Sequence, residues 1–70
     1  MKFLVIIEPT ATGFSAHSPD LPGCASTGRT REEVEVNMRE AIALHLEGLQ
    51  AEGEHIPQPT TESILIEVAA

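Results

Sequence analysis

One long segment, Thr30 to Gly53, has the pattern of a single helix and limits what this 70-residue chain can fold into. It opens on a capping box, in which the Thr30 hydroxyl accepts from the Glu33 amide and the Glu33 carboxylate accepts from the Thr30 amide. Gly53 is a natural left-handed stop and Pro57 prevents the helix from resuming, so the helix should end at about Glu52. The strand-like patterns elsewhere in the chain imply that this helix packs on a sheet, which predicts an α+β fold.

The predicted helix has one apolar side. Gly48 flanks this side, where the missing side chain would allow a close approach to the sheet. At 100° per residue, the residues that fall within an arc of about 100° are Val34, Met38, Ala41, Ile42, His45 and Leu49.

Four short segments are predicted to be strands. Lys2 to Glu8, Phe14 to Ser18 and Cys24 to Gly28 should form an antiparallel meander, and Ser63 to Val68 should follow the helix as a last strand. The element order is then β-β-β-α-β, with one long helix on one face of the sheet. We expect the strand order 3-2-1-4, with the last strand parallel to the first through a right-handed crossover. Residues 1–70 should form one domain.

The first predicted strand is apolar on both of its faces. Phe3, Val5 and Ile7 can face the helix, which leaves Leu4 and Ile6 on the other face. Exposed apolar patches usually mark interaction sites, and Leu65 of the last strand adds to this second face. We therefore expect a homodimer or a higher homo-oligomer built on Leu4, Ile6 and Leu65, with the last strand a candidate for exchange between copies. The alternative is that loops cover this face.

The charge of the chain narrows its partners. Eleven acidic residues stand against four basic ones, which gives a net charge of −7 and a pI of about 4.7. Such a surface repels phosphate backbones, so direct binding of nucleic acid is not expected. The same charge would attract a basic protein, although it can also serve solubility alone. No segment could span a membrane and no signal peptide is apparent, so we expect a cytoplasmic protein.

The residues capable of chemistry do not form a convincing site. His17, Asp20 and Cys24 lie close in sequence, but two prolines intervene and zinc usually needs four ligands of defined spacing. A lone cysteine such as Cys24 is more often a packing residue. Glu8, Asp20 and Glu67 could be pictured as a nuclease cluster, yet nothing in the sequence holds them together. We expect no metal, no cofactor and no enzymatic activity.

Several motifs nevertheless form a recognisable set. They are Gly-Phe-Ser-Ala at 13–16, Ser-Pro-Asp-Leu-Pro-Gly-Cys at 18–24, the helix pattern Thr30-x-Glu32-Glu33-Val34-x-x-Asn37-x-x-Glu40-Ala41-Ile42 with Leu44-x-Leu46-Glu47, and Gly53-Glu54-x-Ile56-Pro57-x-Pro59. In these motifs, over nearly the whole chain, the sequence resembles the HicB family of antitoxins. The resemblance implies a degraded ribonuclease-H-like fold. It also implies binding to a small basic ribonuclease toxin (HicA-like), whose active site the antitoxin blocks.

The resemblance leaves the contact residues open, and the sequence offers two groups of candidates for binding a basic partner. Pro19, Asp20 and Leu21 shape the connector after the second strand, while Glu32, Glu40 and Glu47 offer negative charge on the helix. Many relatives continue into a C-terminal DNA-binding domain, which we do not expect here because the chain ends after the last predicted strand. The alternative function is an orphan structural or oligomerisation domain without a toxin partner.

Overall fold

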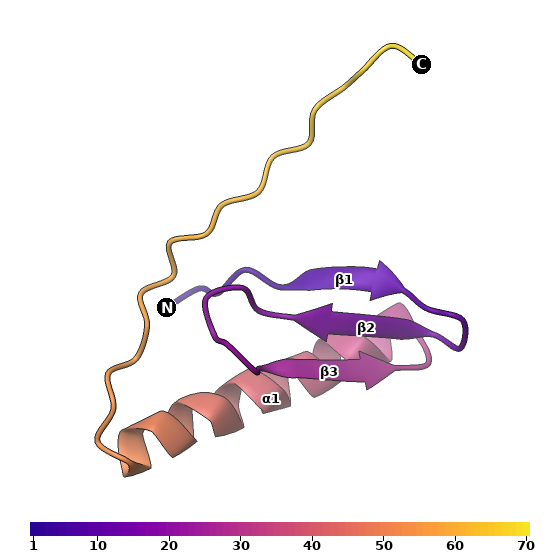
Figure 1. Ribbon diagram of the computed structural model, residues 1–70. Coiled ribbons are helices and arrows are strands. Elements are labelled where there is room, and N and C mark those ends of the chain that lie inside the picture. The colour runs from indigo at the N-terminus through magenta and orange to yellow at the C-terminus, as the bar shows by residue number, and fades with distance from the viewer.

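A computed structural model describes residues 1–70 and contains three strands followed by one helix (Figure 1). The strands are β1 (Ile6–Pro9), β2 (Phe14–His17) and β3 (Ala25–Gly28), and the helix is α1 (Arg31–Ala51). The strands form an antiparallel meander in the order β1-β2-β3, and α1 lies against one face of this sheet. The predicted α+β class and the 3-2-1 part of the strand order are confirmed.

β1 is shorter than the predicted strand, which was expected to begin at Lys2. The antiparallel register pairs Ile6 with His17. β2 ends at His17, and the chain then turns away into a connector that contains two prolines. The residues before Ile6 therefore have no ladder partner. A side chain substitutes for the ladder there, because the Ser18 hydroxyl donates to the Leu4 carbonyl at 2.9 Å.

The core lies between the inner face of the sheet and α1. Its most deeply buried members come from the helix and, unusually, from the connector between β2 and β3. Half-buried side chains from the N-terminal segment, β1, β2 and α1 pack around them. The buried set is Ala16, Leu21, Cys24, Val34 and Met38.

Both ends of α1 are capped, with one difference from the prediction. The Glu33 amide donates to the Thr30 hydroxyl at 3.0 Å, as expected. The Glu33 carboxylate, however, accepts from the Arg29 amide at 3.2 Å rather than from the Thr30 amide. The capping box is therefore displaced by one residue on its carboxylate side. At the other end Gly53 adopts a φ of 70°, as predicted for a left-handed stop.

The helix residues that pack on the core differ from the predicted set, and the closest approach of α1 to the sheet lies elsewhere. Leu46 packs against the core, whereas His45 is only half-buried and lies outside the core cluster. The prediction for Gly48 was wrong, because no atom outside the neighbouring helix backbone lies within 4 Å of where its Cβ would stand. Gly28 of β3 makes the close contact instead, since a Cβ there would lie 2.5 Å from the Val34 amide nitrogen.

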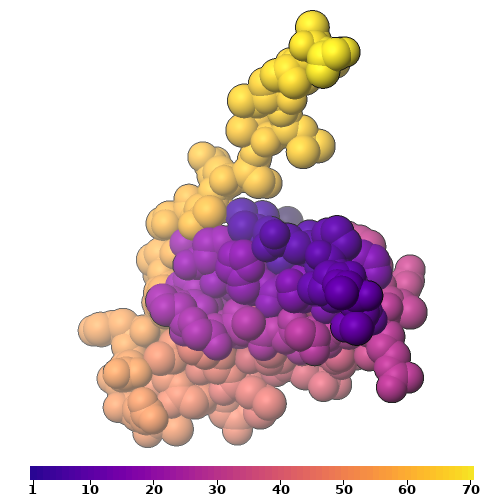
Figure 2. Space-filling view, turned by 45° about the vertical axis from the view of Figure 1, so that its right-hand side comes forward, coloured from indigo at the N-terminus to yellow at the C-terminus, as the bar shows by residue number.

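The predicted last strand does not form within the single chain, so the fourth place in the 3-2-1-4 order is unfilled. After α1 and its turn, residues 54–70 have no regular secondary structure. The first part of this segment lies against the body of the molecule as far as Thr61, and the rest extends away from it (Figures 1 and 2). A strand exists only where a neighbouring edge pairs with it, and this segment meets none. The ribonuclease-H-like comparison stays a prediction.

Candidate protein-binding site

The connector between β2 and β3 is a compact turn held by its own backbone. The backbone amide of Cys24 donates to the Leu21 carbonyl at 3.0 Å, and the backbone amide of Leu21 donates to the Ser18 carbonyl at 3.1 Å. Leu21 is fully buried, whereas Pro19 and Asp20 are half-buried and reach the surface. Leu21 therefore shapes the connector from inside the core and does not offer a contact to a partner, while Pro19 and Asp20 lie at the surface.

Asp20 ties the connector to the segment that follows α1. Its carboxylate accepts from the Thr61 hydroxyl at 2.7 Å, from the Thr61 amide at 3.1 Å and from the Thr60 hydroxyl at 3.4 Å. Hydrogen bonds, the one from the Thr61 hydroxyl first, lower the pKa of Asp20 below its ordinary value, against a desolvation that raises it. Nothing in the sequence pattern indicates this contact, because the partners lie 40 and 41 residues apart.

The solvent side of α1 carries an acidic surface. Glu32, Glu40 and Glu47 are exposed, and at 100° per residue they fall within an arc of about 80°. Neither Arg31 nor Arg39 neutralises them, since both arginines pair with Glu35 at 3.6 and 3.5 Å. These three carboxylates therefore present unpaired negative charge on one side of the helix, away from the sheet. The structure does not bring them together with Pro19 and Asp20, which lie at the end of the sheet.

The residues predicted for self-association are also divided. Ile6 lies on the outer face of β1 opposite His17 and is 37% exposed, while Leu4 just before it is half-buried. Leu65 is fully exposed in the C-terminal segment, which extends away from the body (Figure 1). Leu4 and Ile6 thus share a face, but Leu65 of the same chain is not beside them.

An apolar groove runs between the N-terminal segment with β1 and the flank of α1. Its volume is about 750 Å³. Charged side chains, among them Arg31, Glu35 and Arg39, stand at its edge, and its apolar lining consists of Met1, Phe3, Val5, Ile7, Met38, Ile42, Ala43 and Leu46. Site prediction from the sequence missed this groove. The available signal was the first predicted strand, whose inward face carries more apolar surface than one helix covers.

The structure gathers no chemically reactive cluster. Cys24 is buried in the core, where desolvation raises the pKa of its thiol, and His17 points to the exposed outer face of β2. No group of three or more His, Cys, Asp or Glu side chains could hold a metal ion. The single helix of the chain is not apolar enough over its length to cross a bilayer.

Comparison with known proteins gives a consistent result. A relative from Thermoplasma acidophilum, "UPF0150 protein Ta0767", is 37% identical over 94% of this chain and 97% of its own length. A UPF0150 protein of Synechocystis, ssr1765, is 46% identical over 81% of this chain and 73% of its own. A 14.9 kDa protein of Haemophilus phage HP1 is 38% identical over 83% of this chain, which spans 44% of the phage protein.

A solved structure agrees with these sequence relatives. A chain of the "HicA3 and HicB3 toxin-antitoxin complex" superposes with a TM-score of 0.74 at 35% identity, covering 86% of this chain and 70% of that one. The family described as HicB_like antitoxin of bacterial toxin-antitoxin system matches residues 3–68, which include the extended C-terminal segment. This chain therefore belongs to the HicB-like antitoxin family.

Proposed function

We propose that this protein is the antitoxin of a toxin–antitoxin pair, and that it neutralises a small basic ribonuclease toxin of the HicA type by covering its active site. Membership of the HicB-like antitoxin family carries the proposal, and the match to a chain of a HicA3–HicB3 complex supports the choice of partner. A ribonuclease toxin acts on RNA in the cytoplasm, so its antitoxin should act there too.

The charge distribution supports binding to a basic protein. The chain has a net charge of −7, and Glu32, Glu40 and Glu47 form an acidic surface whose charge no arginine neutralises. Electrostatic complementarity of this kind accelerates association and orients the encounter. Pro19 and Asp20 in the connector offer a second, smaller contact surface at the end of the sheet.

The deciding experiment is inhibition of RNA cleavage by a purified HicA-type toxin from the same genome. Cleavage should fall in proportion to added antitoxin and stop near a fixed molar ratio. A catalytically inactive toxin variant that still binds RNA then tests how inhibition occurs. Antitoxin should displace a labelled RNA from this variant. Inhibition with the RNA still bound would contradict active-site coverage, and no inhibition would contradict the antitoxin role.

A matched pair of triple variants locates the contact surface. Glu32→Lys, Glu40→Lys and Glu47→Lys together should abolish inhibition at concentrations where the wild type is effective, because the surface would then repel a basic partner. Glu54→Lys, Glu62→Lys and Glu67→Lys make the same change of net charge outside α1, and this control should inhibit more strongly than the helix variant. Equal loss in both variants would mean that overall charge matters and the helix surface does not.

A further inference from the structure

We propose that the C-terminal segment of one copy is the missing fourth strand of a second copy. In this arrangement residues 63–68 lie along the free edge of β1 of the partner and fill the apolar groove between β1 and α1. Two copies that exchange these segments reciprocally form a closed dimer. The inference concerns self-association and holds whether or not the proposed toxin exists.

The segment itself has the pattern of a half-buried strand without a sheet. Ile64, Ile66 and Val68 alternate with Leu65 and Glu67, and the four apolar side chains are 73% to 101% exposed. A run of exposed apolar side chains on an extended backbone is unfavourable in water and marks an interaction site. The family match extends to residue 68, so this segment lies within the family's domain and is not a neighbouring linker.

The receiving site has the matching shape and chemistry. β1 is an edge strand, because the sheet order is β1-β2-β3, and its outer backbone groups pair with nothing. Edge strands of this kind readily pair with another chain. The groove of about 750 Å³ beside it is lined mainly by apolar side chains, including Val5, Ile42 and Leu46. A strand paired with β1 would place every second side chain over this groove.

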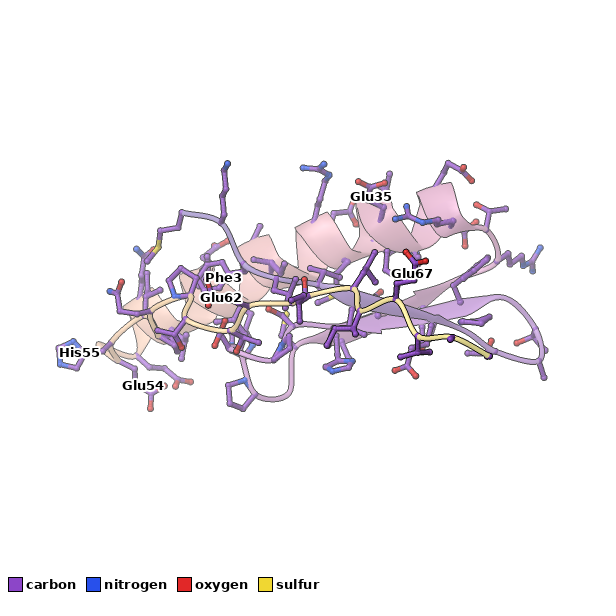
Figure 3. All side chains as sticks on the ribbon, turned by 90° about the horizontal axis from the view of Figure 1, so that it is seen from above. Phe3, Glu35, Glu54, His55, Glu62 and Glu67 are labelled. Carbon is purple, nitrogen blue, oxygen red and sulfur yellow. The ribbon has the colours of Figure 1, made fainter.

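The path of the segment favours a second copy over its own groove. Asp20 fixes Thr60 and Thr61 by hydrogen bonds at the end of the sheet, and neither glycine nor proline lies between Thr61 and Ile64 to turn the chain back. Seen from above, the segment runs along the sheet from Glu62 toward Glu67 (Figure 3). Figure 1 shows that it also rises beyond the β1 edge of the sheet, where a second copy would lie.

The test uses purified full-length protein without any toxin and measures mass by light scattering and native mass spectrometry. The wild type should be a dimer. Ile66→Lys should weaken dimerisation about tenfold or more, because burial of one such side chain accounts for at least that factor. Glu67→Lys introduces the same lysine one residue further on, facing the opposite side, and should leave the dimer largely intact.

A mixing experiment separates exchange from other modes of assembly. Leu46→Lys damages the groove but leaves the segment intact, and Ala43→Arg does the same from an exposed helix position if Leu46→Lys disturbs folding. At a concentration where the wild type is dimeric but which lies below the weakened dissociation constants, the groove variant and Ile66→Lys should each be monomeric alone. They should form a heterodimer when mixed, since one intact segment can enter one intact groove. Circular dichroism must show the wild-type helix content in each variant.

Three results would overturn the inference. A monomeric wild type in which Ile66 is protected from solvent would mean that the segment closes on its own groove. A groove variant that still dimerises alone would indicate that segments pair with each other. A mixture that stays monomeric, with both variants folded, would exclude a segment-in-groove contact between copies.

Discussion

Leu21 is the residue on which the connector depends. It is fully buried although it lies in a loop, so Leu21→Ala should leave a cavity beneath the sheet and lower the free energy of unfolding by about 2–5 kcal/mol. That is a large part of the stability of a domain this small. Urea denaturation at one fixed protein concentration measures it, with Leu44→Ala as the control. Leu44 is 69% exposed, and its loss should change stability by no more than about 0.5 kcal/mol. Equal effects would place Leu21 outside the core.

Asp20 should make the attachment of the C-terminal segment sensitive to acid. Its pKa is lowered in the folded chain by hydrogen bonds, the one from the Thr61 hydroxyl first. The attachment is therefore fully present above the ordinary aspartate pKa of about 3.9 and is lost as pH falls through the lowered value. Nuclear magnetic resonance of the Thr61 amide should show this transition. Asp20→Ala should release the segment at every pH and abolish the transition, and a transition that persists in this variant would have another cause.

At the scale of elements, two glycines should respond oppositely to alanine. In Gly28→Ala the new Cβ would collide with the Val34 backbone at 2.5 Å, so β3 and α1 would have to separate and stability should fall by more than about 1 kcal/mol. In Gly48→Ala nothing stands within 4 Å, and the helix should gain about 0.5–1 kcal/mol. Thermal unfolding of both variants tests the pair. If Gly48→Ala lowered stability instead, the close approach to the sheet that the sequence predicts at Gly48 would be supported after all.

The elements differ in how far their sequence determines them. Local signals sufficed for α1, because the Thr30 cap and the Gly53 stop act within a few residues. They also sufficed for the hairpin of β1 and β2. Local signals failed for the last strand. An alternating pattern such as that of residues 63–68 indicates that a segment can form a strand, but it does not indicate which sheet edge is free to pair with it.

The candidate site depends on the whole molecule, and the sequence predicted it unevenly. The exposure of Glu32, Glu40 and Glu47 followed from helical periodicity alone. The burial of Leu21, the contact between Asp20 and Thr61, and the groove beside β1 arise only when segments far apart in sequence meet. Tertiary contacts of this kind leave no local pattern, which is why Leu21 was counted among the candidates for partner contact although it is buried in the core.

The electrostatic field of the whole molecule gives the last prediction, which rests on the proposed toxin. Changing Glu32, Glu40 and Glu47 to glutamine reduces the net charge from −7 to −4. The association rate with a basic toxin should fall about tenfold at low salt, and its dependence on ionic strength should flatten. The difference should nearly vanish at about 1 M salt, where the Debye length is about 3 Å.

Stopped-flow fluorescence over a series of salt concentrations measures these rates. The control carries Glu54→Gln, Glu62→Gln and Glu67→Gln, which reach the same net charge by changes outside α1. If net charge alone steers the encounter, both variants should slow association equally. If the acidic side of α1 faces the toxin, the helix variant should slow it more, because attraction between charges weakens with their separation. A helix variant that associates at the wild-type rate at low salt would remove this surface from the proposed interface.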